Sequence, residues 1–366
     1  MDIVRKELDK ITVFWNYFAW NYKEIQKNLV WNAEVKTNYY GDILRLFTET
    51  FELFERKPSK GNFHDSIFYF TGLLQIIFIH QDLIDELLRI FKIESSSKND
   101  KNPNRTIRNE LVGHPIRRDK QKKLISSVFW DGDLTTEVLR YRKYSNDDKF
   151  KVEDISYKTE TIITSHYTFL NKYLEKIFEK IRFILGKFAK QLKELENVLD
   201  RGVDFNKLVD LTFQRYEQIF EYNCLYSVSI LKVCNEKKNE HLRYQYVVDR
   251  FKKELKESLV QTQADIKDLI SMIDLKEKDK ESLEKFVFPL KNSSKITQMP
   301  EDYPSELSKL YERHSKSEIV YFKRIFNDDP EMIKELNNME NNNDDNLEYY
   351  SSLEYLKQLI NEKMKK

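Results

Sequence analysis

Residues 65–92 read DSIFYFTGLLQIIFIHQDLIDELLRIFK, the most apolar helix-forming segment of the chain. At 100° per residue, its polar side chains fall in one narrow stripe and apolar side chains cover the rest of the helix. The stripe contains Thr71, Gln75, Asp82, Asp85, Glu86 and Arg89, with Gln81 at its margin and His80 opposite. We therefore expect a helix that is nearly surrounded by other parts of the protein.

Helical periodicity continues on both sides of this segment. Apolar residues at spacings of three and four predict helices over 2–33 and 37–56. A polar loop over 94–104 follows the central helix, and then a short helix that stops at Gly113-His114-Pro115. Glycine suits a left-handed cap at the end of a helix, and proline cannot continue one.

The next part of the chain changes from helical to β-prone sequence. Runs rich in β-branched and aromatic residues lie between 124 and 154, separated by Asp131-Gly132-Asp133 and by a polar turn at 145–148. We expect a small hairpin insert of two or three strands. From about 156 to about 200 the periodicity predicts one helix of roughly 65 Å, which should bridge two parts of the protein or pair with another subunit.

The remaining sequence predicts a second helical region. Helices are expected over 204–236, 239–273, 276–288, 304–327 and 347–364, with irregular stretches over 291–305 and 337–346. The predicted fold is therefore mainly α. A helical-bundle domain with a β-hairpin insert covers 1–200, and a helical C-terminal domain of unknown role covers 201–366.

Composition excludes several classes of function. Among 366 residues there are only 7 glycines, and the closest pair, Gly61 and Gly72, is too far apart for a glycine-rich phosphate loop. Two cysteines exclude a disulfide framework, and no His-Glu-x-x-His appears, so we expect no metal and no cofactor. The longest apolar stretch has 13 residues and no leader sequence is visible, which predicts a soluble, cytoplasmic protein without a membrane partner.

One short segment has the residue types for chemistry. Between Ile107 and Arg118 the chain reads IRNELVGHPIRR, so that five residues separate Arg108 from His114 and Asn109 follows the arginine directly. From 98 to 123 there are nine Lys or Arg and three Asp or Glu, an excess of six positive charges. The whole chain has 62 basic and 61 acidic residues, so this basic cluster is local.

This segment resembles the signature of the HEPN superfamily. That signature is an Arg, four to six residues and a His, with a polar residue directly after the Arg. Its place after an apolar helix and a polar loop, and Gln81-Asp82 midway along that helix, are also similar to family members. The resemblance covers roughly residues 1–200 and implies a helical, metal-independent ribonuclease, in which two copies of the motif face each other across a homodimer. It further implies a toxin or anti-phage effector that an inhibitor or antitoxin protein restrains.

The resemblance assigns a role to each residue of the motif. Arg108 would hold the scissile phosphate, His114 would move a proton, and Asn109 would bind phosphate or orient a catalytic group. Asp82 would orient Arg108, with Gln81 as a second supporting residue. Basic side chains around the motif would hold the RNA backbone, namely Arg105, Arg117, Arg118, Lys120, Lys122 and Lys123.

Two other hypotheses stay open at the level of sequence. In the first, the domain is a non-catalytic HEPN-like module that binds RNA or a nucleotide, while the C-terminal helices bind a protein. In the second, the chain is a helical scaffold in which the motif is coincidental. His80 lies on the apolar side of its helix and reads as a core residue, and the remaining histidines read as structural or exposed.

Overall fold

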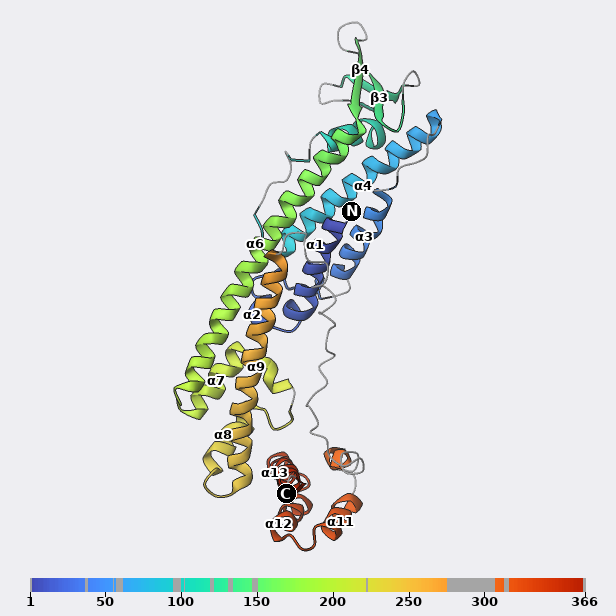
Figure 1. The fold of residues 1–366 in the computed structure, drawn as a ribbon. Helices are drawn as coiled ribbons and strands as arrows, with labels where there is room; N and C mark the ends of the chain where they lie inside the picture. The colour runs from blue at the N-terminus through green and yellow to red at the C-terminus, as the bar shows by residue number, and fades with distance from the viewer. Residues whose placement is uncertain are drawn as a thin grey trace. The chain divides into compact units, whose positions relative to one another are not determined.

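The computed structural model describes residues 2–36, 39–54, 56, 62–94, 100–101, 103–118, 122–130, 134–146, 151–221, 223–274, 307–312 and 316–364. The chain divides into two compact units, Met1–Leu185 and Gly186–Lys366. Both are built mainly from helices, and the first also contains a four-stranded sheet (Figure 1). The mainly α fold with a small β insert is therefore confirmed.

The first unit does not surround its central helix as predicted, because Phe68 on that helix is 84% exposed. The unit is nevertheless built mainly from helices. They are α1 (Asp2–Val13), the π-helix η1 (Phe14–Ala19), α2 (Lys23–Gln26), α3 (Tyr39–Phe54), α4 (Phe63–Ile90), α5 (Asn104–Arg108), the π-helix η2 (Asn109–Gly113) and the first part of α6 (Thr159–Asp200). The single helix predicted over 2–33 is interrupted after Ala19. There the Asn21 side chain donates to the carbonyl groups of Asn16 and Tyr17, and so competes with the backbone ladder.

The central helix α4 begins at a capping box. The Asn62 side chain accepts from the Asp65 N–H, and the Asp65 carboxylate accepts from the Asn62 N–H in return. By length and composition, α4 is the one described helix that qualifies as a candidate membrane span. In this structure it packs against α3 and α5, and His80 is buried as expected from its place opposite the polar stripe.

The sheet is larger than predicted. Its antiparallel strands run in the order β1-β2-β3-β4, namely β1 (Ile116–Arg118), β2 (Leu124–Phe129), β3 (Val138–Ser145) and β4 (Lys151–Lys158). The additional strand β1 begins two residues after His114, and the Ser127 N–H donates to the Pro115 carbonyl at 2.7 Å. Three residues are too few to give β1 an alternating pattern in the sequence, so the hairpin prediction missed it.

The long helix α6 follows β4 directly, within three residues of its predicted start (Figure 1). Its buried side chains recur at three and four, from Leu170 through Leu174, Ile177 and Ile181. The two units divide between Leu185 and Gly186, inside α6. The helix therefore contributes to the cores of both units.

The second unit contains the end of α6 and a further set of helices. They are α7 (Phe205–Arg215), the 3-10 helix η3 (Glu217–Glu221), α8 (Val228–Lys237), α9 (Leu242–Asp274), the 3-10 helix η5 (Leu310–Glu312), α11 (Lys316–Ile325), α12 (Pro330–Asn341) and α13 (Asn346–Met364). The predicted helix over 276–288 and the irregular stretch over 291–305 lie outside the described residues.

The irregular stretch predicted over 337–346 is wrong for its first half, because α12 continues to Asn341. Asp329 caps this helix by accepting from the Met332 N–H at 3.2 Å, and Pro330 occupies its first turn. Met332, Leu336 and Met339 are buried in the core of the C-terminal helices. The apolar face thus outweighs the low helix propensity of the asparagines.

Candidate functional site

The Arg108–His114 segment folds into one helical turn of α5 followed by the π turn η2. The π turn ends where the His114 N–H donates to the Asn109 carbonyl at 2.8 Å, a bond that spans five residues. Turns of this kind are frequent at functional sites in proteins. Arg108 lies at the start of the turn and His114 at its end, so a single local structure positions both residues.

The guanidinium of Arg108 is half-buried and held on three sides. Its Nε and NH2 donate to Gln75 Oε1 at 3.2 and 3.0 Å, and its NH1 donates to Asn109 Oδ1 at 3.1 Å. The group also stacks on the Phe78 ring, 4.0 Å from the ring centroid. A guanidinium has five N–H groups, and these bonds to described residues use three. Two remain for a ligand.

Gly113 allows this close packing. A Cβ atom at Gly113 would lie 2.6 Å from Arg108 NH1, so any side chain there would push the guanidinium away. The predicted left-handed cap at Gly113 is wrong, because among the described residues Gly202 is the glycine with a positive φ. Gly113 is needed instead because the Arg108 guanidinium approaches it too closely to leave room for a Cβ atom. The Arg108 guanidinium consequently lies against the residue that directly precedes His114.

His114 itself is exposed at the end of η2. Its backbone carbonyl accepts from Arg117 NH1 at 3.4 Å, while its imidazole makes no hydrogen bond to the described residues. An exposed imidazole can reach a ligand from solvent. The backbone of His114 directly follows Gly113, which the Arg108 guanidinium approaches closely.

The supporting residues differ from those predicted. Asp82 forms an ion pair with Arg105 at 2.8 Å, and Gln75, two turns earlier on α4, orients Arg108 in its place. Seven residues of helix separate Gln75 from Asp82 by about 10 Å, so the two side chains meet different turns of α5. Gln81 is buried and donates to the Lys101 carbonyl at 3.3 Å.

Among the predicted RNA-binding residues, Arg117 is engaged inside the protein. The buried carboxylate of Glu110 accepts from Arg117 at 3.2 Å, from Lys143 at 2.7 Å and from Tyr141 at 2.8 Å. Burial raises the pKa of Glu110, but the hydrogen bonds from Lys143 and Tyr141 outweigh it and hold the pKa below its usual value. This carboxylate fastens η2 to the inner face of the sheet.

The other predicted RNA-binding residues lie nearer the surface. Arg118 is exposed and donates to the Lys122 carbonyl at 3.2 Å, and Lys122 is exposed beside it. Lys123 is half-buried, and Lys120 lies outside the described residues. Arg105 is half-buried on the Phe78 ring, 4.1 Å from the centroid, next to Arg108.

The structure adds a buried histidine pair that the sequence did not predict. The His80 Nδ1 lies 3.0 Å from the His166 Nε2, and the His80 Nε2 lies 2.9 Å from the Thr50 hydroxyl. Thr50 donates its own proton to the Leu46 carbonyl at 2.6 Å, so it accepts from His80 Nε2–H. His80 Nδ1 must then accept from His166 Nε2–H, and both rings are neutral. Burial lowers the pKa of His80 to about 3.

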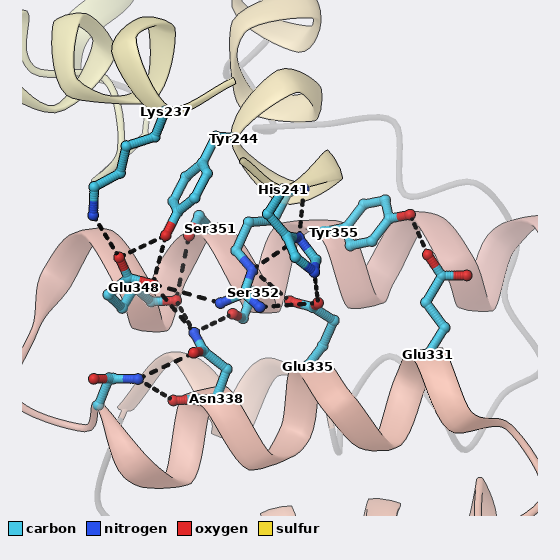
Figure 2. A network of polar contacts seen from close by, with 12 residues as sticks. Lys237, His241, Tyr244, Glu331, Glu335, Asn338, Glu348, Ser351, Ser352 and Tyr355 are labelled. Atoms are coloured by element: carbon cyan, nitrogen blue, oxygen red, sulfur yellow. Dashed lines mark hydrogen bonds and ion pairs between the residues drawn. The ribbon is translucent and has the colours of Figure 1, made fainter. Parts of the chain in front are cut away.

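A second polar cluster lies in the other unit, between the start of α9 and the helices α12 and α13 (Figure 2). Arg243 is 5% exposed and Glu335 is 0% exposed. The Arg243 Nε lies 3.1 Å from Glu335 Oε2, and its NH2 donates to Glu335 Oε1 at 3.2 Å. Burial nevertheless raises the pKa of Glu335, because the Arg243 charge offsets only part of the desolvation.

Glu348 is the second carboxylate of this network. It accepts from Tyr244 at 2.6 Å and from Lys237 at 3.1 Å (Figure 2). Burial raises the pKa of Glu348, but hydrogen bonds from Tyr244, Lys237 and Asn338 hold it below its usual value. Two cations thus face two carboxylates, and the charges balance inside the protein. We interpret this network as a structural link between helices, not as a reactive site.

Comparison of the chain with protein-family models, with curated protein sequences and with solved structures gives no match. Within the part of the chain that the structure describes, no group of three or more His, Cys, Asp and Glu is placed to hold a metal ion. The HEPN resemblance therefore stays a prediction. The geometry around Arg108 and His114 carries the functional proposal that follows.

Proposed function

We propose that the chain is a metal-independent endoribonuclease of HEPN type with Arg108 and His114 in its active site. One observation carries the proposal. Arg105 and Arg117 each have a carboxylate partner, whereas Arg108 has only amide oxygens as partners among the described residues. A fixed, half-buried guanidinium whose charge no carboxylate offsets is a binding group for an anion such as phosphate.

The proposed reaction is attack of a ribose 2′-OH on the adjacent phosphorus. The 2′-oxygen loses its proton and forms a bond to phosphorus, while the bond to the 5′-oxygen breaks and that oxygen gains a proton. The products are a 2′,3′-cyclic phosphate and a 5′-hydroxyl. An imidazole can accept or donate a proton near neutral pH, and a guanidinium stabilises the charge that builds on the phosphoryl oxygens.

A homodimer completes this proposal. Each chain supplies one His114, but the reaction needs both a proton acceptor and a proton donor. A two-fold axis through the site would bring a second His114 and a second Arg108 to the same phosphate. Gln75 and Asn109 act as positioning residues, because each holds the guanidinium through an amide oxygen.

The test compares wild type with Arg108→Ala and His114→Ala on mixed single-stranded RNA in EDTA. We expect wild type to cleave and each variant to lose at least about 100-fold in rate. Arg89→Ala is the control, since Arg89 is an exposed arginine of α4 whose charge is already paired with Glu86 and which has no assigned role in the site. It should keep cleavage within about threefold of wild type. Fragment ends should carry cyclic phosphate.

Two outcomes would reject the proposal. Wild-type rates in both Arg108→Ala and His114→Ala would remove the motif from the reaction. Salt-sensitive RNA binding without cleavage, by a protein shown to be dimeric, would favour the non-catalytic binding module. A role as a toxin or anti-phage effector predicts in addition that expression of wild type, but not of His114→Ala, arrests growth and degrades cellular RNA.

A further inference from the structure

The helices η5, α11, α12 and α13, here called the 307–364 helices, have a hydrophobic core of their own. Their buried aliphatic side chains all pack into one cluster. The members of that cluster lie between Leu307 and Ile360, and none of them comes from α7, α8 or α9. The 307–364 helices therefore form their core without apolar side chains from the rest of the second unit.

The side of these helices that meets α8 and α9 is polar instead. Glu335 of α12 and Glu348 and Glu354 of α13 contact cations of α8 and α9, and the Tyr355 ring lies near those of His241 and Tyr246. Glu335 is 0% exposed and Glu354 is 2% exposed. None of these contact residues is aliphatic, so the described link between the two sets of helices is mainly one of charge.

The charges across this contact are complementary. Lys237 of α8 donates to Glu348 at 3.1 Å, and the Arg243 Nε of α9 lies 3.1 Å from Glu335 Oε2 (Figure 2). Both cations come from α8 and α9, and both carboxylates come from the 307–364 helices. The contact thus joins a basic face to an acidic face.

Arg250 adds a third ion pair, two turns further along α9. Its guanidinium contacts Glu354, and its Nε donates to Glu254 of the same helix at 2.7 Å. Glu354 is held from its own side as well, because Tyr311 and Lys357 both donate to it. Each member of this pair is therefore positioned by its own set of helices.

Ion pairs respond to solution conditions in a way that apolar packing does not. When two charged faces separate, water solvates each charge and returns much of the free energy that the ion pairs supplied. Dissolved salt stabilises the separated charges, which it can reach, more than the buried ones. Apolar side chains gain nothing comparable from contact with water. Salt should therefore separate the charged contact and leave the core of the 307–364 helices intact.

We propose that the 307–364 helices form a releasable module that docks on α8 and α9 through this charged contact. Release exposes a basic face with Lys237, Arg243 and Arg250 on one side, and an acidic face of α12 and α13 on the other. The contact acts as a conformational switch of the second unit, because it controls whether either face is accessible. This proposal is independent of the proposed nuclease, whose residues lie in the first unit.

The experiment measures how fast buried carboxylates of the full chain react with a carbodiimide and an amine, read by mass spectrometry. Release frees Glu335, so its labelling should rise at least about tenfold between low salt and about 1 M NaCl. Glu110, which is buried in the first unit, is the reference and should stay unreactive. Met332 and Met339 lie in the core of the 307–364 helices, and their oxidation by peroxide should stay slow.

Glu348→Lys tests the role of charge at low salt. It places a like charge beside Lys237, so Glu335 should be labelled at least about tenfold faster than in wild type. Adding Lys237→Glu restores a pair of opposite charges and should recover most of the protection. Glu340→Lys is the matched control, since Glu340 pairs with Lys323 within the 307–364 helices, and it should leave Glu335 protected.

Three outcomes would overturn the proposal. Slow labelling of Glu335 both at high salt and in Glu348→Lys would show that the contact is permanent. Parallel increases in Glu335 labelling and Met339 oxidation would show that the helices unfold instead of separating. Fast labelling in Glu348→Lys that Lys237→Glu does not reverse would show that charge is not what holds the module.

Discussion

At the scale of single residues, Gly113 controls the position of the Arg108 guanidinium. Gly113→Ala would place its Cβ 2.6 Å from Arg108 NH1, and the flexible guanidinium would move to relieve this contact. Because the φ of Gly113 is not positive, alanine suits the backbone. We expect RNA cleavage to fall about tenfold or more, while the free energy of unfolding changes by less than about 1 kcal/mol.

Gly72→Ala is the control for this substitution. A Cβ atom at Gly72 would meet no atom within 4 Å, and alanine favours a helix interior over glycine. Cleavage should be unchanged. Equal loss of activity in Gly72→Ala and Gly113→Ala would show that the close approach to Arg108 is not the cause.

The His80–His166 pair makes stability depend on pH. Burial lowers the pKa of His80 to about 3 and that of His166 well below its usual value, and charge repulsion from His80 adds to the second shift. The unfolded chain protonates both near pH 6.5 and so binds more protons than the folded chain below that pH. Stability is therefore fully present above about pH 6.5 and is lost as the pH falls toward 3, by up to about 1.4 kcal/mol per pH unit for each histidine.

Urea denaturation at pH 7, 6 and 5 measures this slope. His166→Phe removes one of the two titrating groups and leaves an apolar ring among Phe54 and Phe169. The variant should be less stable at pH 7, but its loss of stability per pH unit should be about half as steep. An unchanged slope would contradict the assignment of the pH dependence to this pair.

Sequence patterns predicted the candidate residues of the motif but not the residues that contact them in the structure. Arg108, Asn109 and His114 are close in sequence, so their spacing alone brought them together. Gln75 contacts Arg108 across 33 positions, and His166 contacts His80 across 86. Such pairs depend on how two helices pack, which periodicity does not specify. The one available signal for Gln75 was a polar side chain within an otherwise apolar run.

At the scale of elements, Glu110 joins η2 to the sheet. Glu110→Gln would leave Arg117 and Lys143 without their shared carboxylate in a largely buried place. We expect a loss of about 2 kcal/mol in the free energy of unfolding, together with reduced cleavage because the motif loses its anchor. Urea denaturation and the RNA assay measure the two effects.

A double-mutant cycle that combines Glu110→Gln with Tyr141→Phe measures the energetic coupling between these two residues. Tyr141 donates to Glu110 Oε2 at 2.8 Å, so the two substitutions should be less than additive by about 1 kcal/mol. Full additivity would mean that the two residues act independently and that this hydrogen bond does not stabilise the contact between η2 and the sheet.

Elements with a long, regular pattern were predictable, and short or polar ones were not. The helices α3, α4, α6 and α9 have apolar stripes of several turns, and their bounds lie within three residues of those predicted. Strand β1 is too short to show alternation. The helix α12 was missed because its asparagines mask three apolar residues at spacings of four and three.

At the scale of the whole molecule, tryptophan fluorescence follows the unfolding of only one of the two units. All four tryptophans lie in the first unit, at positions 15, 20, 31 and 130, so tryptophan fluorescence reports on that unit only. Arg243→Met would leave the buried Glu335 carboxylate without its cation. We expect the unfolding transition followed by circular dichroism to lose about 3 kcal/mol, while the fluorescence transition shifts by less than about 0.5 kcal/mol.

The control is the double variant that combines Arg243→Met with Glu335→Met. Replacing both members of a buried ion pair by apolar groups removes the unpaired charge, so the double variant should recover at least half of the loss. If fluorescence and circular dichroism shifted together in Arg243→Met, the two units would unfold as one cooperative block.

The π turn at Asn109–Gly113 has a consequence for how this protein changes over generations. A π turn accommodates one more residue than an α turn, and it does so locally, without disturbing the register of the sheet that follows. Loss of a single codon, such as that of Val112, would restore an ordinary turn with four residues between Arg108 and His114, and would leave the following sheet in register. One in-frame deletion or insertion thus changes the spacing of these two residues in a chain that still folds, so this turn is a place where the motif can vary in length over generations.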